Sequence, residues 1–500
     1  MGLRTLGAAV ACVMWAAVSG THAEPTMPLT AQGWSDAARS DINQAYAQFV
    51  ANHPGVHDKA NRGFPALLKK ARQAGLALVP EVKSAEGYEA ALNRFSTTLA
   101  DGHAQAFPII PDNETAAAQW PGFVAVWRAD RLFVYDAEPD GPPKGASIVS
   151  CDGKPVRDLL RDTVFAYQGR IREAGQWWTQ AGALFIDWGN PFVSRPSSCQ
   201  FDEAGHLATR HLTWRATDAF FKSWRADSYN GDSLPIGISE PAPGLLWLAL
   251  PTFEPEANGR DAYRDMEREI NDHRDRFLTA RAIVIDLRHN QGGSDEWGRG
   301  VGEALWGKAR FDRRVAAYMA NAHVLWRASK ENAAYVSRLA GEMRSEKRDV
   351  ADEFEAVAEG LKAAASRGKT WYAEPYDFRA RSKTQVPSDS PGDPAPLATP
   401  VYVIVPGQCA SACNDTLDGF TRFANTRLIG APSSADSTYL EIRVEPLSSG
   451  MSKVVIPNKV WVGRPRAAGE FYRPSIVNAS LTWSTQSFIN LVEADLSDHR

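Results

Sequence analysis

The segment Cys409-Ala-Ser-Ala-Cys413 places a serine between a strand pattern and a helix pattern. The strand pattern is the apolar run Val401-Tyr-Val-Ile-Val405, and an apolar face repeats at helical spacing after the segment. A serine at such a turn can present its hydroxyl in a cleft, beside the free N–H groups and positive dipole end of the helix. Ser411 is therefore a candidate nucleophile for acyl transfer, and its alternative role is the N-cap of the helix.

A glycine-rich loop is the candidate second half of the same cleft. Gly292 and Gly293 follow the buried strand pattern Ile283-Val-Ile-Asp-Leu287, at the carboxyl end where α/β sheets place ligands. Glycine lets the backbone approach a substrate and direct an N–H at it. Together with the N–H of Ala412, this donor would bind an oxyanion, and loss of one donor typically costs roughly 3–4 kcal/mol. The alternative is a tight turn that needs positive φ.

Acyl transfer also needs a base within hydrogen-bond reach of the nucleophile. His103 ends the corner Leu99-Ala-Asp-Gly-His103 at a predicted domain seam, and His289 lies on the strand of the glycine loop. On the residues alone both histidines are candidates. The alternative for each is a structural histidine with satisfied hydrogen bonds.

Length and composition bound the class of protein. A chain of 500 residues is too long for one core and predicts two or three domains. A hydrophobic content of 44% and a charged content of 23% are typical of globular proteins. The net charge of −4 shows no excess of basic residues, so nucleic acid is not an expected partner. No His or Cys group has a zinc-like spacing, so no metal is expected.

The N-terminus has the pattern of a secretory signal peptide. Arg4 precedes an apolar stretch from Leu6 to Val18, and Thr21-His-Ala23 offers a small-x-Ala cleavage site. We therefore expect residues 1–23 to be removed and the mature chain to be exported, either periplasmic or secreted. The apolar stretch is too short for a stable membrane span, so no stable membrane insertion is expected. The alternative is a short anchor that stays uncleaved.

Export changes the interpretation of the cysteines. Cys12 leaves with the signal peptide, and an even set of four remains. In an oxidising compartment we expect the sequence-local pairs Cys151–Cys199 and Cys409–Cys413. The first closes the longer loop and is worth about 4 kcal/mol in the chain-entropy model, and the second about 2 kcal/mol. The alternative at Ser411 is a pair of free, buried cysteines that pack a tight turn.

Apolar spacing predicts an N-terminal helical region over residues 24–105. Residues 106–215 change to short β-like runs broken by Gly and Pro. Within them, residues 143–159 show a short strand, an Asp-Gly turn and a helix start, which resemble the centre of a PDZ-like domain. Such domains bind peptide tails at a sheet edge.

Residues 216–500 show the strand–helix–strand order of a core with parallel, buried strands. Gly244 to Leu250 and Ala282 to Leu287 are the predicted strands, with a helix between them. An insertion at about 310–385 is charged and helical, and it serves either as a lid beside the cleft or as a solvated decoration.

Several motifs in this order resemble the C-terminal-processing, or tail-specific, serine peptidases. The nearest branch is the histidine-using one, with the tricorn core and the interphotoreceptor retinoid-binding protein repeats. The matching segments are the PDZ-like centre, the glycine loop, Phe95 to His103, Gly244 to Phe253, Cys409 to Asp415 and Leu428 to Pro432. The resemblance implies an α/β fold: a crotonase-like ββα catalytic core with an N-terminal helical region and a PDZ-like β-rich domain.

The resemblance also implies roles for the candidate residues. Ser411 is the nucleophile, and Gly293 or Gly292 acts with Ala412 in the oxyanion site. In lysine-using members a Gly-Lys pair after the nucleophile supplies the base. Here Asp436 occupies the corresponding position, so a Ser–Lys dyad is not expected.

The histidine-using branch takes its base from an Asp-Gly-His-like motif, which selects His103 over His289. That branch also has a glutamate downstream of the serine. Glu470 is the candidate at that distance, and the alternative is an ordinary exposed glutamate.

The sequence therefore predicts an exported serine endopeptidase that hydrolyses unfolded or tail-exposed polypeptides without a cofactor. A second hypothesis is a catalytically silent binding protein of the same fold that carries an apolar ligand or a peptide. A third, a crotonase-type enzyme acting on thioesters, is disfavoured by the signal peptide because acyl-CoA substrates are cytosolic. The oligomeric state stays open.

Overall fold

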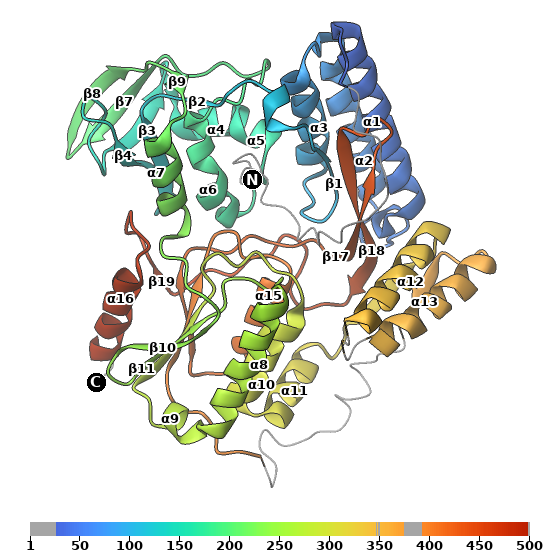
Figure 1. Cartoon of the computed structure of the whole chain (residues 1–500), viewed down its shortest axis with the longest axis vertical. Helices are drawn as coiled ribbons and strands as arrows, with labels where there is room; N and C mark the ends of the chain where they lie inside the picture. Colours follow the sequence, from blue (N-terminus) through green and yellow to red (C-terminus); the bar gives the residue numbers. More distant parts are fainter. Residues whose placement is uncertain (1–26, 347, 349–350, 375–392, 499–500) are drawn as a thin grey trace.

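The computed structural model of the chain describes residues 27–346, 348, 351–374 and 393–498, so the predicted signal peptide lies outside the described residues (Figure 1). The architecture mixes helices and sheets, as the α/β prediction requires. Among the helices of the described ranges, none is long and apolar enough to cross a membrane.

A six-stranded sheet forms the centre of the molecule, in the order β10-β11-β12-β15-β16-β19. Neighbouring strands from β11 to β19 are parallel, and β10 pairs antiparallel at one edge. The strands are β10 (Gly237–Ala242), β11 (Leu245–Ala249), β12 (Ala282–Asp286), β15 (Val401–Val405), β16 (Thr426–Gly430) and β19 (Ile476–Val477). Every residue of β11, β12 and β15 is buried, which explains their continuous apolar runs.

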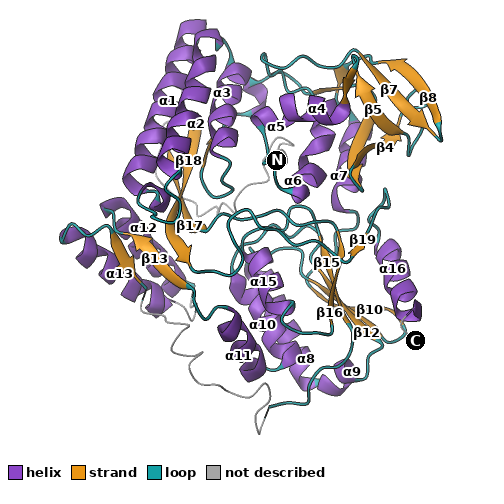
Figure 2. Cartoon of the chain, turned by 180° about the vertical axis from the view of Figure 1, so that it is seen from behind, coloured by secondary structure: helices purple, strands orange, loops and turns teal. Residues whose placement is uncertain are grey.

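Helices cover both faces of this sheet (Figure 2). One face packs against α8 (Ala257–Asp272), α9 (Arg274–Leu278), α10 (Asp295–Trp306), α11 (Lys308–Tyr318) and α15 (Ala412–Phe420). The opposite face packs against α16 (Thr485–Asp498) and the indole of Trp483. Because parallel strands end at one edge, the loops after β12, β15 and β16 come together there.

The N-terminal helices pack on a second, antiparallel sheet. They are α1 (Ala31–Asn52), α2 (Phe64–Leu78) and α3 (Ala85–Leu99), which confirms the helical spacing seen in the sequence. The sheet consists of β1 (Gln105–Pro108), β18 (Ser452–Val462), β13 (His323–Arg327) and β14 (Trp371–Ala373), with β17 (Tyr439–Pro446) also paired to β18. Chain segments far apart in sequence thus share one core.

The insertion at about 310–385 is not only helical. Its helices α12 (Lys330–Ser345) and α13 (Ala351–Ser366) match the prediction, but β13 and β14 extend the β18 sheet. Both strands are short, and a pattern of three to five residues is too brief to indicate a strand from sequence. The residues between 374 and 393 lie outside the described ranges.

A β-rich unit lies beside the N-terminal helices (Figure 1). Its sheet has the order β3-β4-β5-β7-β8, with β6 paired to β5. The elements are β2 (Gln119–Trp120), β3 (Phe123–Arg128), β4 (Arg131–Ala137), β5 (Ser147–Cys151), β6 (Lys154–Pro155), α4 (Val156–Asp162), α5 (Val164–Tyr167), α6 (Ala174–Gln180), β7 (Ser198–Glu203), β8 (His206–His211), β9 (Arg215–Ala216) and α7 (Ala219–Asn230). Cys151 and Cys199 lie opposite each other on β5 and β7 and form the predicted disulfide.

The segment around α6 joins this unit to the central sheet. The Gln176 amide donates to the Ser434 hydroxyl at 2.7 Å, and that hydroxyl donates to the Gly407 carbonyl at 2.7 Å. The Glu173 carboxylate accepts a bond from the Ala435 N–H at 2.9 Å. The β-rich unit therefore contacts the loops after β15 and β16, which flank Ser411.

Candidate active site

Ser411 lies at the turn between β15 and α15, directly before the first helical residue. Its backbone has φ 54° and ψ −129°, a region that costs a non-glycine residue on the order of 1–3 kcal/mol. A strained strand-to-helix turn of this kind holds a serine hydroxyl away from the backbone, toward a cleft. The Ser411 side chain makes no capping hydrogen bond to α15, so the N-cap alternative is not supported.

The predicted disulfide between Cys409 and Cys413 spans this turn, with its Cα atoms 5.3 Å apart. Both cysteines are fully buried. Within the turn, the Cys413 N–H donates to the Ala410 carbonyl at 3.0 Å, and the Asp415 N–H donates to the Ser411 carbonyl at 3.0 Å. A covalent bond and the first main-chain bonds of α15 therefore fix the turn.

Gly292 packs directly against the Ser411 turn. A Cβ at this glycine would lie 2.7 Å from the Ala410 carbonyl oxygen, 3.0 Å from the Ser411 Cβ and 3.4 Å from the Ala412 nitrogen. Its φ of +113° is also one that L side chains rarely adopt. The structure thus brings together the two segments that the sequence assigned to one cleft.

Gly293 is held by a neighbouring segment. It forms a parallel bridge with Phe253, and a Cβ at Gly293 would lie 2.1 Å from the Phe253 carbonyl oxygen. The Gly292 N–H donates to the Asn290 side chain at 2.9 Å, and the Gly292 carbonyl accepts a bond from the Phe253 N–H at 3.1 Å. The loop therefore has a fixed course past Ser411, and both glycines are needed for it.

His103 is buried in the corner that follows α3, with 7% of its surface exposed. The backbone N–H of His103 donates to the Asp101 carboxylate at 2.8 Å, and the Ser437 hydroxyl donates to the same oxygen at 2.9 Å. The ring atom Nδ1 is buried and has no hydrogen-bond partner among the described residues. Burial raises the pKa of Asp101, and the charge of His103 opposes this rise.

The carboxylate of Asp436 binds the main chain of Ser411. Its Oδ1 accepts a bond from the Ser411 N–H at 2.5 Å, and its Oδ2 accepts one from Arg466 Nη1 at 2.8 Å. Burial disfavours the charged carboxylate, but Arg466 first and His103 next outweigh burial, so the pKa of Asp436 is lowered. The sequence identified this position only as one that lacks a lysine, and no local motif marks Arg466 as its partner.

An ionic cluster surrounds α15 on the same side. Arg466 also binds Asp415 at 2.9 Å and Asp418 at 3.1 Å, while Arg464 pairs with both carboxylates. The Tyr472 hydroxyl donates to Asp418 at 2.5 Å. Burial is the largest cause that raises the pKa of Asp415 and of Asp418 to about 6, although Arg466 opposes it. These carboxyls stabilise the position of the 464–472 segment over α15.

Glu470 lies in this same segment but faces solvent. The Gly469 N–H donates to the Asp436 carbonyl at 2.8 Å, so the loop touches the site. The Glu470 carboxylate accepts a bond from the Ala467 N–H at 2.9 Å. Among the described residues, no hydrogen bond or ion pair joins Glu470 to His103, so its predicted role stays a prediction.

The ring of His289 contacts the segment after α7. Its Nε2 lies 3.2 Å from the Asp232 carbonyl oxygen, and burial lowers its pKa. This contact ties the end of β12 to the segment after α7. Of the two candidate bases, the one whose corner is bonded to the 436–437 segment is His103.

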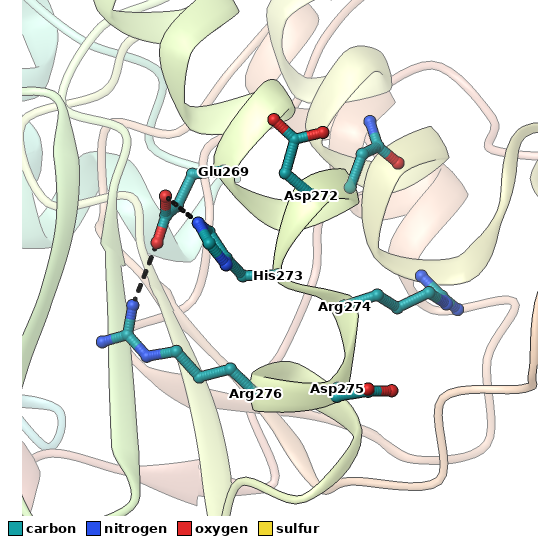
Figure 3. Close-up of a pocket in the computed structure, with 7 residues that line it drawn as sticks. Glu269, Asp272, His273, Arg274, Asp275 and Arg276 are labelled. Atoms are coloured by element: carbon teal, nitrogen blue, oxygen red, sulfur yellow. Dashed lines mark hydrogen bonds and ion pairs between the residues drawn. The ribbon is translucent and has the colours of Figure 1, made fainter.

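A surface pocket lies away from Ser411, at the turn between α8 and α9 (Figure 3). It has a volume of about 420 Å³, and Glu269 bridges His273 at 3.5 Å and Arg276 at 3.2 Å along its wall. It contains no residue of the Ser411 site. Within the described ranges, no group of three or more His, Cys, Asp or Glu residues could hold a metal ion.

The fold matches solved structures, whereas no family model and no curated protein matches the sequence. Mature CPAF in complex with lactacystin has a TM-score of 0.60 at 13% identity, covering 93% of this chain and 98% of CPAF. A second structure of mature CPAF has a TM-score of 0.56 at 13% identity, covering 89% and 93%. The photosystem II D1 C-terminal processing protease also matches, with a TM-score of 0.34 at 14% identity over 88% of this chain and 93% of that protease.

The chain shares the fold of mature CPAF over nearly its whole length.

Proposed function

We propose that this chain is a serine peptidase that hydrolyses peptide bonds of unfolded or tail-exposed polypeptides. The observation that carries the proposal is the packing of the Gly292 loop against a strained Ser411 at the N-terminus of α15. Nucleophile, helix N-terminus and glycine backbone then meet at one edge of the sheet, as oxyanion stabilisation requires.

In the proposed reaction, the Ser411 hydroxyl attacks the scissile carbonyl carbon and His103 takes its proton. The carbonyl electrons move to oxygen, where the Gly293 and Ala412 N–H groups stabilise them. Gly293 is preferred to Gly292 because the Gly292 N–H already donates to Asn290. The C–N bond then breaks as His103 returns the proton to the leaving amine, and water repeats the steps on the acyl-enzyme.

The same proposal extends to the parts of the molecule that frame the site. The central sheet with its helices would be the crotonase-like core, residues 216–500, and the β-rich unit would be a PDZ-like domain at residues 106–215. A cleaved signal peptide at residues 1–23 would deliver the chain to the periplasm or outside the cell, where both disulfides persist. Glu470 remains the proposed third member of the catalytic group.

The binding-protein alternative would need an apolar cavity. Two surface pockets among the described residues are lined mainly by charged and polar residues, and neither is lined by a tryptophan. These pockets give no support to the alternative in which the protein carries an apolar ligand.

The test is cleavage of an unfolded protein by the purified mature chain, beside the variants Ser411→Ala and His103→Ala. Loss of cleavage in both variants is the expected result. Loss of cleavage in Ser411→Ala alone would mean that another residue is the base, and His289→Ala would then be the next variant to measure. If the unmodified chain neither cleaves nor reacts with a fluorophosphonate, a serine-directed reagent, the peptidase proposal fails.

A further inference from the structure

Two adjacent residues connect the nucleophile segment to the histidine corner. Asp436 accepts the Ser411 N–H at 2.5 Å, and the hydroxyl of Ser437 donates to Asp101 at 2.9 Å. The same Asp101 oxygen accepts the His103 N–H at 2.8 Å. Ser411 follows β15 of the central sheet, whereas His103 precedes β1 of the sheet that contains β18. The two-residue bridge Asp436–Ser437 therefore links two different parts of the fold.

The bridge is itself held from several sides. Arg466 binds the Asp436 carboxylate at 2.8 Å, and the Gly469 N–H donates to the Asp436 carbonyl at 2.8 Å. Just before the bridge, Glu173 accepts the Ala435 N–H at 2.9 Å. Asp436 is 3% exposed, so water does not compete for these bonds. A side chain with this many fixed partners cannot easily move, which is what a positioning group requires.

The negative charge of Asp436 has a specific use at this place. A bond from an N–H to a carboxylate is stronger than one to a neutral oxygen, and it stabilises a serine in a strained backbone conformation. A buried carboxylate near His103 also stabilises the imidazolium that forms when the histidine takes the serine proton. His103 is, after Arg466, a cause that lowers the pKa of Asp436, in agreement with this role.

We propose that Asp436 is a positioning residue for the serine peptidase reaction: it fixes the main chain of Ser411 while Ser437 holds the Asp101–His103 corner. This inference rests on the proposed function. It assigns a role to the position that carries lysine in the lysine-using peptidases. The acid here acts through Ser411 and His103 and does not take the proton itself.

The test compares Asp436→Asn with Asp418→Asn. Asp418 is also buried and also binds Arg466, at 3.1 Å, but it makes no bond to Ser411, so it is a matched control. The readouts are the rate of Ser411 reaction with a fluorophosphonate, kcat and KM for an unfolded protein substrate, and the melting temperature. We expect Asp436→Asn to lower kcat and the labelling rate by about 100-fold with little change in KM. Asp418→Asn should lower them much less at a similar melting temperature.

Ser437→Ala is the milder second variant, in case Asp436→Asn does not fold. It removes one bond to Asp101 and should lower kcat by about 5- to 10-fold, a size typical of one lost hydrogen bond. Equal losses in Asp436→Asn and Asp418→Asn, or an unchanged labelling rate in Asp436→Asn, would overturn the positioning role alone. A wild-type chain that does not react with the fluorophosphonate would overturn the proposed function and this inference with it.

Discussion

A Cβ added to Gly292 would lie 3.0 Å from the Cβ of Ser411, closer than ordinary van der Waals contact, so the glycine backbone passes directly beside the serine. Gly292 comes from the loop after β12, and Ser411 comes from the turn after β15. These parallel strands are neighbours, with Asp286 opposite Ile404, which places their following loops at the same edge. The close approach of the Gly292 loop to the Ser411 turn is thus a consequence of strand order.

Gly292→Ala should abolish most of the activity without unfolding the chain. The new methyl group would meet the Ala410 carbonyl at 2.7 Å, and the residue would need a φ of +113°. Because the loop must move away from Ser411, we expect kcat/KM to fall by about 100-fold or more. Fluorophosphonate labelling and the melting temperature would be measured together.

Gly205→Ala is the control for this prediction. Gly205 also has positive φ, +94°, but a Cβ there would meet nothing within 4 Å. This variant should share the backbone strain but keep full reactivity of Ser411. A similar loss of labelling in both variants would mean that strain, and not contact with the nucleophile, causes the effect.

Removal of the Cys151–Cys199 disulfide should mainly lower stability, whereas removal of the Cys409–Cys413 disulfide should mainly lower the reactivity of Ser411. Cys151 and Cys199 are 48 residues apart, and Cys409 and Cys413 are 4 apart. In the chain-entropy model the first contributes about 4 kcal/mol to the free energy of unfolding and the second about 2 kcal/mol. The double change Cys409→Ala with Cys413→Ala should therefore cost less stability. It should still remove most Ser411 reactivity, because this disulfide spans the turn that contains Ser411.

The double change Cys151→Ala with Cys199→Ala should do the reverse, lowering the free energy of unfolding while the native protein keeps its reactivity. Denaturant unfolding and labelling of the folded protein measure the two quantities. The idea that the short disulfide braces the nucleophile would be wrong if its removal left the labelling rate unchanged.

Contiguous motifs explain which parts of the site could be predicted from sequence. Ser411 and the Gly292 loop each follow an apolar strand pattern, and the cysteines at 409 and 413 flank the serine. In contrast, the bonds of Asp436 to Arg466 and of Ser437 to Asp101 join residues far apart in the chain. Their side-chain types are ordinary, and only the packed structure places them together. The strands β13 and β14 were missed because they are too short for periodicity to show.

Arg128 should be essential for holding the β-rich unit against the core. Its guanidinium lies 3.8 Å from the Trp178 ring centroid and donates to the carbonyls of Ser480 and Leu481. It is 1% exposed, and burial lowers its pKa to about 9. Arg128→Met keeps much of the volume but leaves these carbonyls without donors. We expect a loss on the order of 3 kcal/mol in unfolding free energy.

Limited proteolysis and denaturant unfolding would measure this loss. Arg157→Met is the control, because Arg157 also stacks on an indole, that of Trp177 at 4.7 Å, but lies on the surface. Equal stability of the two variants would show that the buried guanidinium does not secure the unit.

His53 should make the fold sensitive to acid. It is fully buried, stacks on Phe64 with ring centroids 4.2 Å apart, and accepts the Gly55 N–H at 2.9 Å through Nδ1. Burial lowers the pKa of His53 from its ordinary 6.5 to about 3, so the unfolded chain binds a proton that the folded chain excludes. Its contribution to stability is therefore complete above pH 6.5 and falls as the pH drops from 6.5 toward 3.

His53→Asn keeps an acceptor for the Gly55 N–H but cannot take a proton in this range. The variant should be less stable than the wild type at pH 8, because it loses the ring contact with Phe64. The difference in unfolding free energy should then shrink as the pH is lowered from 7 to 4, since only the wild type carries the proton penalty. Urea unfolding of both proteins at several pH values measures this difference, which cancels the carboxyl titrations that they share. A difference that stays constant with pH would show that His53 is not excluded from protonation in the folded chain.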